Sequence, residues 1–465
     1  MWLILAVILC ALLGYLLIEP TWNGETGGLQ ALFYSCLAVC FGLGAFSVTF
    51  LIARALHVTH IFKADLFAVT LLAALRLATR RHRPKPVPAR TPNSELPGHL
   101  RRLLIAAFAI SICVAAYALL ARAIVHPHGD GWDAFAIWNL HARFLFLGGS
   151  HWRDGYSSLI PWSHPDYPPL LPAAIAHFWT YLDSDAAAVP IALGLVFTAA
   201  TAGLLYASLA INRSRESAML ATVTLLSTPF FIEQGAAQYA DIPLSFFFLA
   251  ALVLLNQGWS TNSRRLLLLS GLAAGFAAWT KNEGLLFFLS AIISQALSLI
   301  MGKRFVGPTS FRRLLAFCAG AAPLLALISW YKHFLAPPGD LFTSPALMTA
   351  KMMSLSRYWV ILQWYGKEFL RFGEWWIIPL TLAVPALYLV SRDEQPGERA
   401  FALRASILTL GLTLVGYFAI YVITPNELYW HLRFSLNRLF LSLWPSVIFL
   451  FFSSVSFRSP ARVSK

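Results

Sequence analysis

The sequence has 465 residues, of which 58% are hydrophobic and only 12% are charged. Soluble domains of ordinary composition carry about 25% charged residues, so this chain is not an ordinary soluble protein. Its formal net charge of +14 would suit a nucleic-acid-binding protein, but no recognised nucleic-acid-binding module accompanies the charge. The basic residues instead gather in short segments between apolar runs, where membrane orientation and anionic lipid headgroups account for them.

Apolar runs long enough to cross a bilayer as helices recur along the chain. They predict an all-α, polytopic integral membrane protein, because a membrane β-barrel would show alternating segments of about ten residues. We expect about 12 spans, each near the length that crosses the hydrocarbon core. They lie near 2–18, 30–55, 102–125, 186–210, 217–232, 241–257, 266–280, 284–301, 314–335, 374–390, 400–423 and 436–453. The run 61–83 carries scattered charges and is expected to lie in the membrane interface as an amphipathic helix.

Basic segments set the expected orientation, because loops rich in lysine and arginine stay in the cytoplasm. With the spans above, the strongly basic segments all fall on one face, and they comprise 80–90, Arg101–Arg102, 212–215, Arg264–Arg265, 302–305 with Arg312–Arg313, and the last nine residues. The opposite, outer face then holds the segments 126–185, 233–240, 281–283, 336–373 and 424–435. These outer segments contain almost every unusual polar residue of the chain.

Several outer-face residues are basic, against the orientation rule. They are Lys281, Lys351, Arg357, Lys367, Arg371, Arg433 and Arg438. Such residues indicate an anionic ligand on the outer face. The alternative is that long side chains at span ends reach back to the interface.

The first outer segment opens with "HPHGDGWD", residues 126–133. Pro127, Gly129 and Gly131 break any helix there, and an amphipathic helical pattern starts at Asp133. One interpretation is that Asp133 caps this helix. The other is that its carboxylate, held near the positive end of the helix dipole, accepts a proton in a transition state.

His126, His128, Asp130 and Asp133 could in principle hold a metal ion. Their spacing matches no recognised ligand pattern, so we expect neither a metal nor another cofactor. All five cysteines lie in apolar runs, which implies no disulfide framework.

Four further outer segments carry candidate substrate-binding residues. His164, Asp166 and Tyr167 precede two prolines that stiffen the entry into an apolar run, although they also suit an ordinary loop. Asp241 begins a span two residues before a proline, and Lys281 with Glu283 lies at a junction between spans, where the lysine could contact a phosphate. His431, Arg433 and Arg438 enter a span from outside. An arginine inside an apolar run is costly unless it faces a partner or a ligand.

The order of these motifs resembles a known family. The loop aspartate leads a short helix that ends at Ala142–Arg143, and Gly148–Gly149, Pro168–Leu170, "YADIPLSFFFLAAL" and "TKNEG" follow. This order is similar to the GT-C class of polyprenyl-phosphate-dependent glycosyltransferases, which includes bacterial aminoarabinose transferases, protein O-mannosyltransferases and rhizobial lipid A sugar transferases. The similarity covers roughly residues 100–300.

The resemblance implies a catalytic base at Asp133, with Asp130 as the competing choice, and a phosphate-binding cation at Lys281. The glutamate that often follows the aspartate in this family is Ala134 here. The implied reaction moves one sugar, with inversion, from a polyprenyl-phosphate donor to a glycan, lipid or protein acceptor. It would take place at the periplasmic face of the cell membrane.

The resemblance also suggests three parts of the chain. These are an N-terminal membrane segment with a basic cytoplasmic linker (1–95), a GT-C-like core (96–335) and a C-terminal outer loop with further spans (336–465). Two other functions stay open: a transporter or flippase for a lipid-linked sugar, and a non-catalytic membrane protein that shares the fold.

Overall fold

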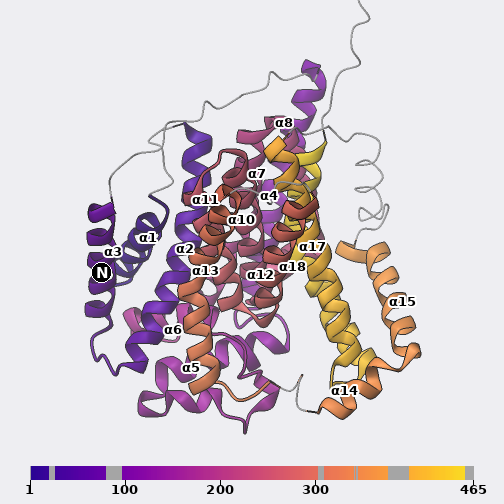
Figure 1. The fold of residues 1–465 in the computed structure, drawn as a ribbon. Coiled ribbons are helices and arrows are strands. Elements are labelled where there is room, and N and C mark those ends of the chain that lie inside the picture. The colour runs from indigo at the N-terminus through magenta and orange to yellow at the C-terminus, as the bar shows by residue number, and fades with distance from the viewer. Residues whose placement is uncertain are drawn as a thin grey trace, which may run out of the picture.

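The computed structural model describes residues 2–19, 27–79, 97–301, 308–339, 341, 344–374 and 397–455. Helices dominate these residues, and no strand occurs among them. The all-α prediction is therefore confirmed for the described part of the chain. Figure 1 shows the long helices running side by side as a bundle, with α5 and α14 at its lower end and α8 near its upper end.

The helices follow the chain in this order. The N-terminal part contains α1 (Trp2–Ile18), α2 (Gly28–Ala55), α3 (Ile61–Thr79) and α4 (Gly98–Val125). The first large loop contains η2 (Ala134–Trp138), α5 (Asn139–Leu147), η3 (Gly149–Tyr156), η4 (Pro161–Ser163) and α6 (Leu170–Leu182). The central part contains α7 (Ala188–Asn212), α8 (Arg215–Leu226), α9 (Pro229–Ala236), α10 (Asp241–Ser260), α11 (Arg264–Thr280), α12 (Asn282–Met301) and α13 (Pro308–Phe334). The C-terminal part contains α14 (Pro345–Met352), α15 (Leu355–Arg371), η6 (Phe372–Glu374), α17 (Gly397–Ile423) and α18 (Leu428–Ser454).

Eight of the described helices are long and apolar enough to cross a membrane: α2, α4, α7, α10, α12, α13, α17 and α18. Two further predicted spans, α1 and α11, are helices of 17 residues each. The run 217–232, predicted as one span, forms two helices, α8 and α9. The break falls at Thr228, because the residue before a proline avoids the helical conformation. The predicted span 374–390 lies almost wholly outside the described residues.

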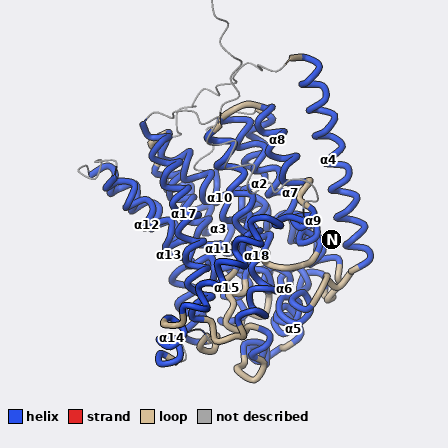
Figure 2. Tube along the Cα trace, turned by 90° about the vertical axis from the view of Figure 1, so that its right-hand side faces the viewer, coloured by secondary structure: helices blue, strands red, loops and turns tan. Residues whose placement is uncertain are grey.

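Close backbone contacts hold the centre of the bundle together. A Cβ added at Gly271 of α11 would lie 1.8 Å from the carbonyl oxygen of Phe317 in α13. The reverse contact, from Gly320 to Leu268, has the same distance. Small residues at such crossings let two helices approach closely, which is how helices associate where lipid removes the hydrophobic driving force. By contrast, α4 runs along the edge of the bundle in Figure 2. Only 6% of its apolar 18-residue stretch is buried, as expected of a helix that faces lipid.

The N-terminal helices pack directly on the first large loop. Asp65 of α3 accepts hydrogen bonds from Tyr181 (2.7 Å) and Thr49 (3.1 Å), and its Oδ2 lies 2.9 Å from Nε2 of His177. The other ring nitrogen of His177 donates to the carbonyl oxygen of Phe46 at 2.8 Å. The side chains of Asp65 and His177 are fully buried. This polar cluster joins α2 and α3 to α6, although the division of the chain at residue 95 stays a prediction.

Candidate active site

The turn 126–131 takes a backbone shape that needs its glycines. Gly129 and Gly131 have φ values of +89° and +91°, in the region that favours glycine. A Cβ at Gly129 would lie 2.9 Å from the carbonyl oxygen of Ala237, and one at Gly131 would lie 2.6 Å from the hydroxyl of Tyr239. The turn therefore sits closely against the segment that leads into α10.

Polar side chains fix the same turn in place. Gln238 donates to the carbonyl oxygen of Pro127 at 3.1 Å and accepts from Asn139 at 2.8 Å. Asp130 pairs with Arg122 at the end of α4, and Arg122 also donates to Glu233 at 2.7 Å. Of the two candidate bases, Asp130 is thus turned toward α4 and α9.

Asp133 points in another direction. It lies at the start of a helical segment that includes the π-helical turn η2, and its side chain makes no capping hydrogen bond. Its Oδ2 instead accepts a hydrogen bond of 2.6 Å from Nη1 of Arg438 in α18. The alternative interpretation of Asp133 as a helix cap is therefore not what the structure shows. A π turn inside a helix is frequent at functional sites.

Arg438 joins Asp133 to a buried pair of charges. Its Nε and Nη2 donate to Oδ2 of Asp241 at 2.9 and 2.8 Å. Oδ1 of Asp241 accepts from Nζ of Lys281 at 3.0 Å, and this ammonium group lies 3.0 Å from Glu283. We call Asp133, Arg438, Asp241, Lys281 and Glu283 the charged network. Its members come from the first large loop, the start of α10, the α11–α12 junction and α18.

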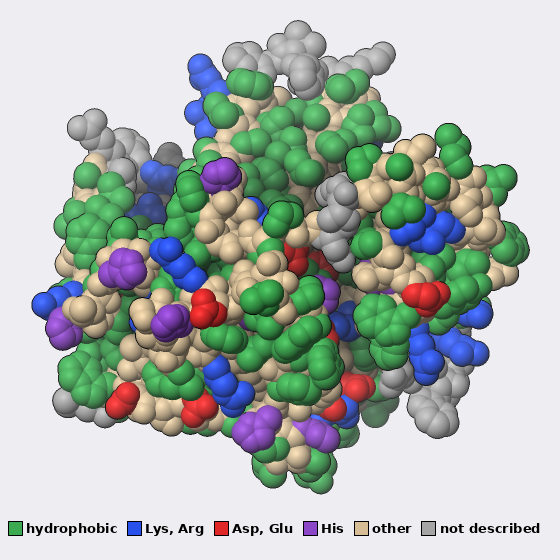
Figure 3. All heavy atoms as spheres, turned by 90° about the horizontal axis from the view of Figure 1, so that it is seen from below, with side chains coloured by type: hydrophobic (Ala, Val, Ile, Leu, Met, Phe, Trp, Pro, Cys, Tyr) green, Lys and Arg blue, Asp and Glu red, His purple; other side chains and the backbone are tan. Residues whose placement is uncertain are grey.

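The side chains of the charged network differ in how exposed they are. The side chain of Asp241 is only 1% exposed, whereas that of Asp133 is 23% exposed. Burial alone would lower the pKa of Lys281, but Asp241 and Glu283 outweigh it and raise that pKa. With every group ionised, three carboxylates face two cations, so the network carries one net negative charge. Asp133 is the most exposed member of the network. Figure 3 shows the lower end of the bundle, where acidic, basic and histidine side chains reach the surface among apolar ones.

Aromatic rings form one wall of the charged network. Tyr167 stacks on Trp138 with centroids 5.7 Å apart, and the ring of His164 stacks on Tyr167 at 5.0 Å. The ammonium group of Lys281 lies 5.6 Å from the centroid of Tyr167. Burial raises the pKa of Tyr167 well above its usual value, and the nearby carboxylates add to this effect. Tyr167 therefore stays neutral.

Asp166 belongs to a second set of contacts beside this wall. It accepts from Asn282 at 2.7 Å, and its carboxylate lies 3.6 Å from Nζ of Lys332. Lys332 also donates to Asn282 at 2.8 Å. We did not predict Lys332, which stands in the last turn of α13 and looks in sequence like an ordinary end of a span. Tyr239 was not predicted either, because a tyrosine next to a span looks equally ordinary in sequence. Its ring centroid lies 4.7 Å from the Arg438 guanidinium.

Two candidates from α18 lie apart from the charged network. Nδ1 of His431 lies 2.9 Å from the hydroxyl of Thr424. Arg433 is exposed, with its guanidinium 5.6 Å from the ring centroid of Phe434. His126, His128, Asp130 and Asp133 do not converge either, and the described residues contain no group of three or more histidine, cysteine or acidic side chains placed to hold a metal ion.

Part of the chain is similar to a known protein family. Residues 164–331 match the family model described as dolichyl-phosphate-mannose-protein mannosyltransferase. The matched region, about a third of the chain, contains Asp166, Tyr167, Asp241, Lys281 and Glu283 but neither Asp133 nor Arg438. No curated protein and no solved structure matches the chain. The apolar helices and this similarity to a membrane glycosyltransferase family together identify an integral membrane protein.

Proposed function

We propose that the protein is a membrane glycosyltransferase that moves one sugar from a polyprenyl-phosphate donor to an acceptor at the periplasmic face, with inversion. The observation that carries this proposal is the charged network. A partly exposed carboxylate, Asp133, is joined through Arg438 to Asp241, which in turn accepts a hydrogen bond from Lys281. Asp241 and Lys281 both belong to the family-matched region. The network thus combines a candidate proton acceptor with cations suited to a phosphate.

The proposed reaction is a single displacement. An acceptor hydroxyl or amine attacks the anomeric carbon of the donor, and its proton passes to Asp133. The bond between that carbon and the phosphate oxygen breaks on the opposite side, and the oxygen leaves with the electron pair. Arg438 and Lys281 stabilise the negative charge that develops on the leaving phosphate. We further expect Asp166, Tyr167 and His164 to line the donor site beside Lys281.

The charge of the network suggests how the donor enters. Because the network is already negative, a phosphate added to it would be repelled unless it takes over one of the cations. Nη1 of Arg438, which contacts the more exposed Asp133, is the group most open to this exchange. Nε and Nη2 would stay on buried Asp241. Donor binding would then release Asp133 from its ion pair and make it available as the base.

A transporter or flippase fits this arrangement less well. Transporter sites lie near the middle of the membrane, often between broken helices. Here Asp241 is the first residue of α10, Lys281 follows α11 directly, and Glu283 is in the first turn of α12. Four of the five network residues therefore stand at helix ends on one side of the bundle. This position favours chemistry at the membrane surface.

The test compares envelope glycans and membrane lipids of cells that lack the gene with those of cells complemented by wild type, Asp133→Asn or Asp130→Asn. We expect one glycan or lipid to lose a sugar on deletion, and wild type and Asp130→Asn to restore it. Asp133→Asn should not restore it, although the protein is made in normal amounts. An unchanged set of glycans and lipids after deletion would refute a transferase. Restoration by Asp133→Asn would refute only the assignment of the base.

A further inference from the structure

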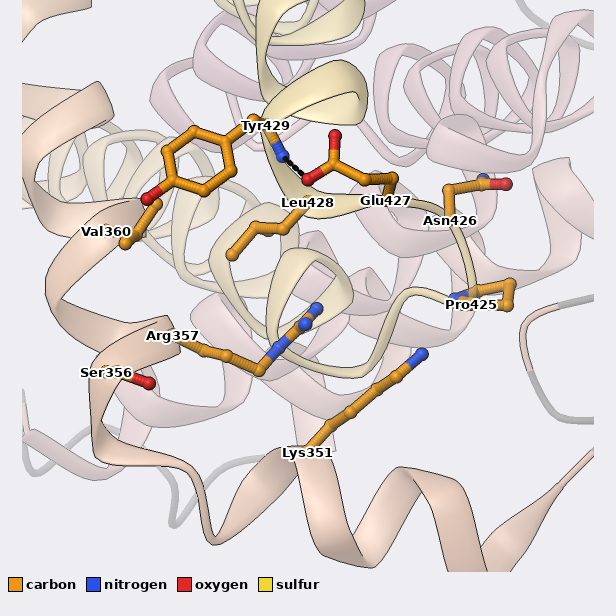
Figure 4. Close-up of a pocket in the computed structure, with 9 residues that line it drawn as sticks. All are labelled: Lys351, Ser356, Arg357, Val360, Pro425, Asn426, Glu427, Leu428 and Tyr429. Carbon is orange, nitrogen blue, oxygen red and sulfur yellow. Dashed lines mark hydrogen bonds between the residues drawn. The ribbon is translucent and has the colours of Figure 1, made fainter.

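A cavity of about 600 Å³ opens between α14, α15 and the turn that joins α17 to α18. Figure 4 shows its lining, in which the side chains of Lys351 and Arg357 extend toward the turn 424–428. Asn426 and Tyr429 contribute further polar groups. None of these residues belongs to the charged network or to the family-matched region.

The two cations hold the end of α17 but keep donors to spare. Lys351 donates to the carbonyl oxygen of Thr424 at 2.6 Å, which uses one of its three N–H groups. Arg357 donates through Nε and Nη2 to the carbonyl oxygens of Val422 and Tyr421, each at 3.0 Å. Its Nη1 makes no hydrogen bond with the described part of the chain. Both side chains can therefore cap a helix and still bind a ligand.

The charge of the cavity favours an anion. Its lining carries two cations and one carboxylate, Glu427, for a net charge of +1. The Glu427 carboxylate is already engaged, because it accepts hydrogen bonds from the backbone N–H groups of Tyr429 and Trp430. Burial lowers the pKa of Arg357, an effect that Glu427 offsets in part. An anion in the cavity would stabilise the charged form of Arg357.

The surface beside the cavity is apolar. Leu355, Trp359 and Leu362, spaced by four and three residues, form one exposed stripe along α15, with exposures of 82%, 64% and 54%. Ser356, which lines the cavity, borders this stripe and lies about 60° around the helix from Trp359. Arg357 and Val360 line the cavity further around the same helix. A ligand that filled the cavity with an anionic group could therefore lay hydrocarbon chains along the stripe.

We propose that this cavity binds the phosphate group of an anionic membrane lipid in the outer leaflet. The phosphate would accept hydrogen bonds from Lys351 and from Nη1 of Arg357, and the acyl chains would follow the apolar stripe of α15. This assignment gives a role to two of the basic residues that oppose the orientation rule. It does not depend on the proposed sugar transfer.

The experiment titrates the purified full-length protein in detergent with dioctanoyl phosphatidylglycerol and follows binding by thermophoresis. Lys351→Gln combined with Arg357→Gln should weaken binding by about tenfold or more, the factor expected for a lost charge-assisted hydrogen bond. The matched control removes two cations of α15 that do not line the cavity, through Lys367→Gln and Arg371→Gln, and should change affinity by less than about twofold. Dioctanoyl phosphatidylcholine should bind more weakly than phosphatidylglycerol.

A second variant guards against damage to α17. Asn426→Asp adds a carboxylate to the wall of the cavity and leaves both capping cations in place, so it should also weaken binding of phosphatidylglycerol. Wild-type affinity in both Asn426→Asp and the double variant would overturn the proposal. An equal loss in the control variant would overturn it too, since binding would then follow overall charge. Displacement of the lipid by equimolar inorganic phosphate would assign the cavity to free phosphate and overturn the lipid assignment.

Discussion

Asp241 and Asp133 both pair with Arg438, but the structure predicts opposite consequences when each is changed to asparagine. Asp241 is almost fully buried and accepts three hydrogen bonds from two cations. Breaking a buried ion pair costs about 3–5 kcal/mol. Asp133 accepts one such bond, and its carboxylate is partly exposed, so solvent screening reduces the loss to about 1 kcal/mol. Asp241→Asn should therefore destabilise the protein much more than Asp133→Asn.

The order reverses when the rate of sugar transfer is compared per folded molecule: Asp133→Asn should lose more activity than Asp241→Asn. Removing a general base reduces a rate by about 10²–10⁴, so Asp133→Asn should be nearly inactive although it is stable. Asp241→Asn should keep part of the activity, because Asp133 still stands at the open end of the network.

The assay is thermal unfolding of both purified variants in detergent, followed by tryptophan fluorescence, alongside turnover of the donor at a temperature where both are folded. Wild type and Asp130→Asn serve as references, since Asp130 pairs with Arg122 instead. Equal melting temperatures for Asp133→Asn and Asp241→Asn would refute the division into an exposed chemical end and a buried structural end. So would full turnover by Asp133→Asn.

Two further predictions concern a donor contact and a buried histidine. Arg438→Lys keeps the charge but cannot bridge Asp133 and Asp241 with a planar fork, so the KM for the donor should rise about tenfold or more in steady-state kinetics. An unchanged KM would make Arg438 purely structural. Burial lowers the pKa of His141 to about 4, from an ordinary value of 6.5. Between these pH values the unfolded chain binds a proton that the folded protein does not, so stability should fall as the pH falls from 6.5 toward 4. His141→Gln should flatten the plot of melting temperature against pH between 6.5 and 4. A plot as steep as that of wild type would show that His141 does not cause this pH dependence.

All five members of the charged network could be singled out from the sequence, because a charge beside or inside an apolar run is costly and therefore conspicuous. The sequence could not predict how those charges pair. Asp133 and Arg438 are 305 residues apart. They meet because α18 packs against α10 and the turn before Asp133 lies against the segment that leads into α10. The same limit left Asp130 as a competing choice beside Asp133, since Arg122, which distinguishes them in the structure, looks in sequence like an ordinary last-turn arginine of α4.

Spacing along the sequence does not decide which polar residues around the start of α18 reach the charged network. Glu427, His431 and Arg438 stand at intervals of four and seven residues, which would put all three near one face of a continuous helix. In the structure Glu427 precedes the helix and caps it, and His431 bonds back to Thr424. Arg433 is five residues from Arg438, which places it on a different face. A regular spacing therefore indicates a shared face only if every member lies inside the helix.

Arg438 makes two unequal contacts, one with a buried carboxylate and one with a more exposed carboxylate. Arg438 stands in an apolar helix, where an unpaired cation would be costly. Buried Asp241 offsets that cost by accepting hydrogen bonds from two nitrogens of the guanidinium group. Because those two contacts hold Nε and Nη2, only Nη1 is directed at the more exposed Asp133. A ligand that arrives from outside therefore meets one carboxylate and one replaceable guanidinium contact, backed by a fixed pair. An incoming anion can therefore replace Asp133 on Nη1 of Arg438 more easily than it can replace buried Asp241 on Nε and Nη2. The proposed mechanism requires this difference, because the donor phosphate must release Asp133 to act as the base while Arg438 stays in place.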